Sequence, residues 1–323
     1  MSTETLPEAR RAGGSGAHAT KTPDDLGLPG KPVVAGPKDT PAAHLRAKLD
    51  AQLRALLVAE PGTRSGVDPE DLHQMRVAVR RMRSVLKLAG STAAQHARAE
   101  LKWLGAALGE VRDYDVLIAH LRATVATFDE QDRPAADRFV AIFSAERTKA
   151  RRRLNRKLNT VRYSSILAEV AQLSRAAEIE TADGAVRLDP VRAVRRPYRR
   201  LAKAVSALAD DPPDGDLHAL RIYGKRLRYA AELAIPAAKK KQAPTLRSLV
   251  KAARKLQDVL GEHQDAVVAA DRSRALALAS RDPGVSLVAG RVVEREVTRR
   301  AEARAAWPGA IATIDTLAAR LGL

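Results

Sequence analysis

Apolar residues recur every three or four positions along most of the chain, which is the period of one face of an α-helix. A first helix is predicted to open at Pro41 and to end at Pro61-Gly62. A second is predicted to begin at Asp68-Pro69, with Asp68 as N-cap, and to run to about Gly90. No run of alternating β-branched residues is long enough for a sheet, so the predicted fold class is all-α.

The rest of the chain continues this helical pattern. Residues 1–40 are rich in Gly, Pro, Ser, Thr and Ala and lack periodicity, so we expect a disordered tail there. Loops are expected at residues 181–184 and 211–215. Helices are predicted at about 92–127 with an interruption near Arg112-Asp113, at 134–158, after Tyr163, from Asp189-Pro190 onward, and at 216–234, 243–280, 286–306 and 309–321.

Motifs of the first half of the chain return in the second half. The segment His73–Arg83 aligns with His218–Arg228 at a shift of 145 residues. The segment Leu108–Asp113 aligns with Leu260–Asp265 at a shift of 152 residues, and Gln264 stands where the first half has Arg112. Ordered matches at similar shifts indicate a duplication, so we expect two pseudo-symmetric helical halves, residues 41–180 and 181–323.

Each motif helix carries a column of cations beside its apolar stripe. The apolar stripes are Leu72, Met75, Val79, Met82 and Leu86 in the first half, and Leu217, Leu220, Gly224, Leu227 and Ala231 in the second. One position further on lie the cations, His73, Arg76, Arg80, Arg83 and Lys87, and His218, Arg221, Lys225 and Arg228. Like charges at these spacings destabilise a helix, which suggests that a bound anion neutralises them. The alternative is pairing with acids on neighbouring helices, namely Glu110, Asp113, Asp115, Glu262 and Asp265.

The overall charge agrees with an anionic ligand. The net charge is +18, and the first forty residues contribute none of it, because they hold five Lys or Arg and five Asp or Glu. Such an excess favours nucleic acid, an acidic membrane surface or another polyanion, or it serves solubility alone. Aromatic residues are only 3% of the chain and none stands in a column, which disfavours a protein that stacks single-stranded bases.

Several function classes are not expected. The chain has no cysteine, no phosphate-binding Gly-rich loop and no Gly-x-Ser-x-Gly elbow, so we expect no enzyme. His73 and His218 have no nearby partner histidine, so we expect neither a metal nor another cofactor. No secretory signal and no apolar run long enough to span a membrane is visible, so the cytoplasm is the expected compartment.

At the two motif helices the sequence resembles the CHAD domain, the conserved histidine α-helical domain. The resemblance rests on His-x-x-Arg-x-x-x-Arg/Lys-Arg-x-Arg at His73–Arg83 and His218–Arg228, and on a Leu-Gly-x-x-x-Asp turn at Leu108–Asp113 and Leu260–Asp265. It covers about residues 41–323. It implies two four-helix subdomains with a basic groove or pore between them, and binding of inorganic polyphosphate at polyphosphate granules.

The resemblance also implies which residues bind the anion. Carried over by position, they are His73, Arg76, Arg80, Arg81, Arg83, His218, Arg221, Lys225, Arg226 and Arg228. Lys87, Lys102 and Arg254 are added because of their charge and position. Members of the family are often fused to a CYTH triphosphate hydrolase, but its Glu-x-Glu-x-Lys signature is missing, so that activity is not expected. The alternative function is sequence-nonspecific nucleic-acid binding.

Overall fold

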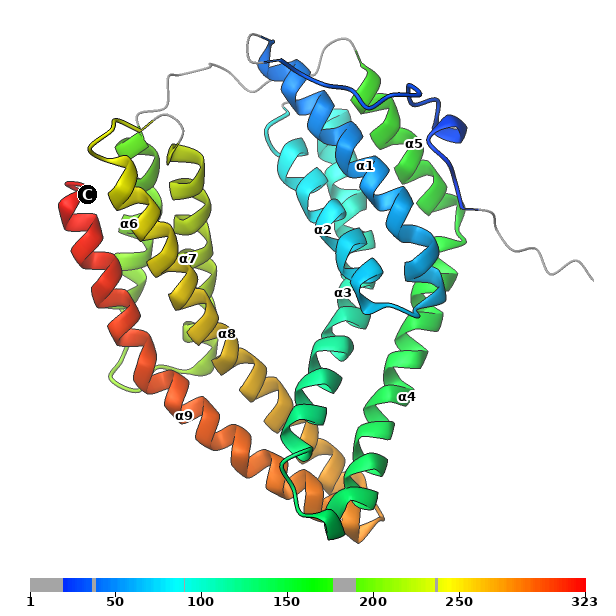
Figure 1. Ribbon diagram of the computed structural model, residues 1–323, viewed down its shortest axis with the longest axis vertical. Helices are drawn as coiled ribbons and strands as arrows, with labels where there is room; N and C mark the ends of the chain where they lie inside the picture. Colours follow the sequence, from blue (N-terminus) through cyan, green and yellow to red (C-terminus); the bar gives the residue numbers. More distant parts are fainter. Residues whose placement is uncertain (1–19, 37–38, 90, 177–189, 236–237) are drawn as a thin grey trace, which may run out of the picture. The chain divides into compact units, whose positions relative to one another are not determined.

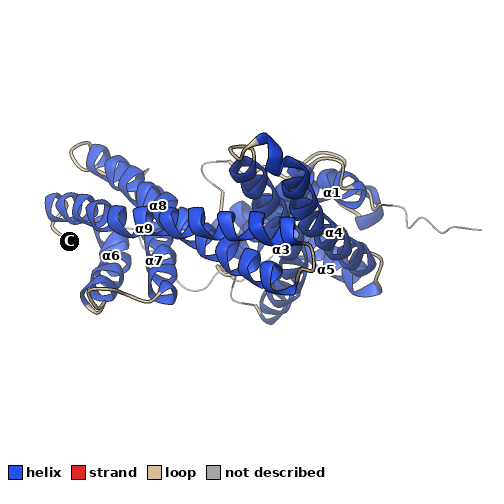
Figure 2. Ribbon diagram, turned by 90° about the horizontal axis from the view of Figure 1, so that it is seen from below, coloured by secondary structure: helices blue, strands red, loops and turns tan. Residues whose placement is uncertain are grey.

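The computed structural model describes residues 20–36, 39–89, 91–176, 190–235 and 238–323, and these residues contain helices but no strand (Figure 2). The all-α prediction is therefore confirmed. Two short 3-10 helices also occur, η1 (Asp24–Leu26) and η2 (Glu130–Asp132). The α-helices are α1 (Pro41–Ser65), α2 (Pro69–Leu86), α3 (Thr92–Val125), α4 (Arg133–Leu158), α5 (Val161–Arg175), α6 (Pro190–Ser206), α7 (Asp214–Ala234), α8 (Ala243–Ala279) and α9 (Pro283–Arg320).

The helices pack into two compact units that do not follow chain order. Unit 1 comprises residues 1–112 and 150–182, and unit 2 comprises residues 113–149 and 183–323. The expected first half, residues 41–180, includes the segment 113–149, which belongs to unit 2 in the structure. Its apolar residues Leu121, Phe139 and Phe143 are buried in one cluster with Val288 and Val292 of α9, which explains why it belongs to unit 2.

In unit 1, α1 lies against α2 and α5 (Figure 1). The leucines that recur at helical spacing in α1 are buried, namely Leu45, Leu49, Leu53 and Leu56. The whole predicted apolar stripe of α2, from Leu72 to Leu86, is buried too. The predicted N-cap of α2 is confirmed, because the Asp68 carboxylate accepts a 2.8 Å hydrogen bond from the backbone N–H of Glu70. Thr40 caps α1 in the same way through the Ala43 backbone N–H.

The prediction of a disordered tail over residues 1–40 is wrong for residues 20–36. Leu26 and Leu28 of this segment are buried. The backbone N–H of Val33 donates a 3.0 Å hydrogen bond to the buried carboxylate of Asp50. Two apolar anchors and a buried acceptor fix the segment onto unit 1, although its composition is typical of a flexible chain. Residues 1–19 lie outside the described residues, as do the predicted loop 181–184 and the cap positions Gly90 and Asp189.

Unit 2 has two apolar clusters. One joins α6, α7, the first half of α8 and the end of α9, and it includes Val194, Leu201, Leu227, Leu256 and Ile314. The other joins the end of α3, the start of α4, the end of α8 and the start of α9. The long helices α8 and α9 run side by side and contribute to both clusters (Figure 1).

Three predicted helix breaks are wrong. Helix α1 continues through Pro61 to Ser65, and α9 continues through Pro308 to Arg320. A proline removes one intrahelical hydrogen bond, but Ile311 and Ile314 beyond Pro308 are buried, and their packing keeps the last turns helical. The expected interruption at Arg112-Asp113 is absent too, because α3 is continuous from Thr92 to Val125. Among the described residues, none of the helices is both long and apolar enough to cross a membrane.

Candidate anion-binding site

The cation column of unit 1 lies along α2 and its C-terminal end. His73, Arg76 and Arg83 are half-buried, whereas Arg80 and Arg81 are exposed. Lys87 is exposed and occupies the C-cap position, where its backbone N–H bonds the carbonyl of Arg83. The buried apolar stripe on the neighbouring face fixes the rotation of α2, so the column cannot turn into the core.

Gly109 of α3 makes room for the half-buried Arg76 of α2, because a Cβ on Gly109 would lie only 3.0 Å from Arg76 Nη1. Gly105, one turn earlier, faces Arg83, and a Cβ there would lie 3.9 Å from Arg83 Nη1, at ordinary contact distance. Lys102 precedes Gly105 by three residues, so it shares this face of α3, and it is exposed. The expected Leu-Gly turn at Leu108–Asp113 is therefore wrong as a turn, because the segment is helical and its glycine seats a guanidinium.

Unit 2 repeats this arrangement on α7 and α8. A Cβ on Gly261 would lie 3.4 Å from Arg221 Nη2, and Arg221 Nε donates a 3.5 Å hydrogen bond to the carbonyl of Gln257. Arg254 precedes Gln257 by three residues and is exposed, as Lys102 is in unit 1. Leu260–Asp265 is likewise helical rather than a turn. In each unit an arginine of the motif helix thus lies on a helical glycine of the next helix.

Gly224, which stands in the apolar stripe of α7, allows a close approach to α8. A Cβ added to it would lie 3.0 Å from Cδ2 of Leu256, which is fully buried. The missing side chain lets α7 press against α8, so the cations of α7 keep their place beside Gly261.

Arg83 and Arg228 occupy the same position in the two motifs, and both are half-buried. The Nε of each is buried and makes no hydrogen bond within the described part of the chain. Arg228 Nε lies 3.8 Å from Glu232, which is an ion pair at the limit of contact, and no ion pair to Arg83 is found among the described residues. Two equivalent arginines therefore keep donor capacity that the protein does not use.

Two of the acids proposed as partners of the columns bind other cations. Glu110 pairs with Arg153, and Asp115 pairs with Arg147, both on α4. Asp265 differs from these two acids. Partial desolvation raises its pKa above the usual value of an aspartate, and the nearby Arg221 cation opposes this rise. The pairing alternative thus applies to Arg221 but not to Arg83.

Two tyrosines of α7 lie beneath the cations. The Arg226 guanidinium is 5.6 Å from the ring centre of Tyr223. Lys225 and Arg228 both lie over Tyr229, at 5.9 and 4.8 Å. These tyrosines stand outside the column, so its spacing did not indicate the contacts. Such cation–π contacts hold the charged groups against the helix surface.

The first turn of α7 is anchored by a charged cluster. Asp214 accepts hydrogen bonds from Arg300, whose Nη2 is 2.7 Å away, and from Arg304 Nη1 at 3.0 Å. The buried imidazole of His263 lies 3.1 Å from the same carboxylate oxygen. Burial holds the pKa of His263 below its usual value, although Asp214 opposes this. This cluster fixes the start of the helix that carries the second column.

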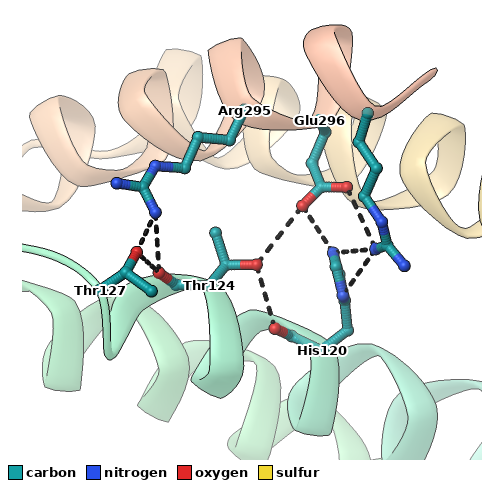
Figure 3. A network of polar contacts seen from close by, with 6 residues as sticks. His120, Thr124, Thr127, Arg295 and Glu296 are labelled. Atoms are coloured by element: carbon teal, nitrogen blue, oxygen red, sulfur yellow. Dashed lines mark hydrogen bonds and ion pairs between the residues drawn. The ribbon is translucent and has the colours of Figure 1, made fainter. Parts of the chain in front are cut away.

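A second polar network ties α3 to α9 within unit 2 (Figure 3). His120 Nε2 lies 2.5 Å from the buried Glu296 carboxylate, while Arg299 Nη1 lies 2.9 Å from His120 Nδ1. Arg295 donates to Thr127 and to the Thr124 carbonyl. These α9 arginines therefore serve packing, and the sequence assigned no role to His120 or Glu296.

The sequence matches the family model of the CHAD domain over residues 47–274. The chain belongs to the CHAD domain family. A crystal structure of the CHAD domain from the plant Ricinus communis is similar, with 26% identity and a TM-score of 0.66, over 88% of this chain and 95% of that chain. No curated protein is similar to this chain at a significant level.

A second solved structure, PptA from Streptomyces chartreusis, shares the fold of this CHAD domain. Its sequence identity is 23% and its TM-score is 0.57, over 83% of this chain and 98% of that chain. The matched family segment contains both motif helices and the glycines that seat Arg76 and Arg221. Among the described residues, no group of three histidine or carboxylate side chains converges as a metal site would require.

Proposed function

We propose that this CHAD domain protein binds inorganic polyphosphate through the cation columns of α2 and α7. The observation that carries the proposal is the pair Arg83 and Arg228, which occupy equivalent positions and keep a buried Nε donor without a hydrogen-bond partner in the described structure. Family membership gives the second support, since the resemblance of the motif helices implies this ligand.

The chemistry of the columns suits a chain of phosphates. A guanidinium presents several N–H donors in one plane and binds two oxygens of one phosphate at once. Cations that recur every three or four residues of a helix stand about 5–6 Å apart, so successive side chains can contact one extended polyanion. Arg76 lies against Gly109 and Arg221 lies against Gly261, so both guanidinium groups are already packed on the next helix before a ligand binds.

Nucleic acid is the alternative polyanion, and the tyrosines of α7 argue against it. Proteins that bind single strands without sequence preference stack bases on exposed aromatic rings. Tyr229 is exposed but lies beneath Lys225 and Arg228, and Tyr223 lies beneath Arg226. Their ring faces hold the protein's own cations. We propose a binding module without a catalytic step, located in the cytoplasm at polyphosphate granules.

The test compares long-chain polyphosphate binding by the wild-type protein and by the double variant R83M/R228M. Methionine keeps an unbranched stem of similar length and removes the guanidinium. We expect at least a tenfold loss of affinity, since each charge-assisted contact contributes about 1.5–3 kcal/mol. The slope of log affinity against log salt should also fall by about 1.5, because two fewer phosphates are neutralised.

The matched control is R98M/R281M. Arg98 and Arg281 are exposed and make no ion pair among the described residues, so the same charge is removed outside the columns. We expect less than a threefold loss for this variant, because only the net charge has changed. An equal loss in both double variants would show that polyphosphate responds to overall charge, and it would overturn the assignment to α2 and α7.

A further inference from the structure

Helix α6 carries a second dense set of cations, which lies outside both motif helices. Arg192, Arg195, Arg196, Arg199, Arg200 and Lys203 recur at spacings of three and four, and all six are exposed. The helix contains no acid at all. Its opposite face is apolar, and Val194 and Leu201 are buried in the core of unit 2. The cations therefore form one outward stripe, here called the α6 basic face.

The α6 basic face is unfavourable for the protein alone. Each cation has like-charged neighbours one helical turn away, and Arg192 stands in the first turn, where the helix dipole disfavours positive charge. Within the described chain none of the six pairs with an acid. Arg195 donates to the carbonyl of Gly322, which is a neutral acceptor.

The corresponding helix of the first half does not share this property. Helix α1 also precedes a motif helix and packs against it, as α6 packs against α7. Its Arg54 pairs with Asp50 at 2.8 Å, and its Arg64 pairs with Glu60 at 2.6 Å. The unpaired stripe is therefore not a requirement of the duplicated fold, and it belongs to the second half alone.

The α6 basic face joins the motif helix α7 at a small pocket. Arg196, Pro197 and Arg200 of α6 line it together with Tyr223 and Arg226 of α7, and its volume is about 160 Å³. Arg226 belongs to the motif and follows Lys225 of the column directly. Three guanidinium groups from two helices thus meet in one recess, with the Tyr223 ring beneath one of them.

We propose that a polyphosphate chain bound along α7 continues through this pocket onto the α6 basic face. This inference rests on the proposed function and extends it to a second contact surface. The six cations span about 16 Å of helix axis, so the stripe suits a ligand with many phosphates close together rather than a single phosphate. A bilayer surface does not suit it, because the apolar side of α6 is buried and none of it is left to enter the lipid.

Chain length is the property that distinguishes this second contact. A long chain held on α7 presents its next phosphates to α6 at high effective concentration, so the two contacts reinforce each other. Tripolyphosphate is too short to lie along both surfaces and gains nothing from the second one. The α6 basic face should therefore raise the affinity for long polyphosphate only.

The experiment measures binding of long-chain polyphosphate and of tripolyphosphate to the wild type and to R196Q/R200Q. The control, R122Q/R281Q, removes two exposed arginines of the same unit that form no ion pair among the described residues. We expect R196Q/R200Q to bind the long chain roughly fivefold more weakly, the size expected of two exposed charge contacts, and tripolyphosphate as the wild type does. The control should bind both ligands as the wild type does.

Melting of the ligand-free variants separates binding from folding. R196Q/R200Q relieves repulsion, so its Tm should equal or exceed that of the wild type. A lower Tm would show that the two arginines hold the fold and would overturn the inference, as would unchanged long-chain binding or an equal loss for both ligands. If the wild type itself binds no polyphosphate, the proposed function fails first, and the inference fails with it.

Discussion

Replacing Arg83 with methionine should make the ligand-free protein more stable. Arg83 is half-buried on α2, and its buried Nε has no hydrogen-bond partner in the described structure. Arg80 and Lys87 stand one helical turn away on either side and repel it. Methionine keeps the packing of the stem and removes both the unused donor and the charge.

The size of the effect follows from these contacts. A buried donor without a partner costs about 1–3 kcal/mol, and partial exposure of Arg83 places its cost at the lower end. Relief of two like-charge pairs adds about 0.2–0.5 kcal/mol each. The free energy of unfolding should thus rise by about 1–2 kcal/mol, which corresponds to a Tm increase of about 3–6 °C for a unit of this size.

The assay is urea unfolding of the ligand-free protein, followed by circular dichroism at the helical band. Arg98→Met, on an exposed face of α3, is the control and should change the stability by less than about 0.5 kcal/mol. A destabilisation of R83M by more than 1 kcal/mol would refute the reasoning, because Arg83 would then have a structural partner. Arg228→Met should gain less, since Glu232 and Tyr229 contact that guanidinium.

Three further predictions concern α7 and its contacts with α8 and α9. Asp214→Asn should lower the free energy of unfolding, measured in urea, by about 1–2 kcal/mol, because Arg300 and Arg304 would then donate to a neutral acceptor. An unchanged free energy of unfolding would contradict the anchoring role. Gly224→Leu should lower the Tm, because overpacking against α8 costs about 1–3 kcal/mol. An unchanged Tm would mean that α8 shifts to make room for the leucine. Burial lowers the pKa of His263, so protonation favours the unfolded chain, and stability should fall as the pH drops from about 7 to about 5. His263→Gln should flatten this slope, and an unaltered slope would assign the pH dependence to other groups.

The sequence predicted the motif helices well because two signals coincide there. The apolar stripe from Leu72 to Leu86 and the cations one position further on fix both the core face and its neighbour. Asp68-Pro69 marked the start of α2 through local chemistry, which acts without tertiary contacts. Gly224 was identifiable because a glycine within an apolar stripe implies close packing.

The features that the sequence did not predict depend on partners far along the chain. Pro61 and Pro308 are local break signals, but packing of the residues beyond them keeps α1 and α9 helical. The pair His120 and Glu296 joins residues 176 apart, and neither carries a recognisable motif. The arginines of the α6 basic face are visible in the sequence, but their connection to the motif depends on the pocket that they share with Tyr223 and Arg226 of α7.

The most direct test of the account is a competition experiment at physiological salt. Labelled long-chain polyphosphate bound to the protein is challenged with single-stranded DNA, duplex DNA, RNA and ATP, and unlabelled polyphosphate serves as the reference. We predict that only polyphosphate displaces the label efficiently, because closely spaced phosphates match the cations of α2 and α7. Equal displacement by the nucleic acids would contradict it, and the columns would then be an unselective basic surface.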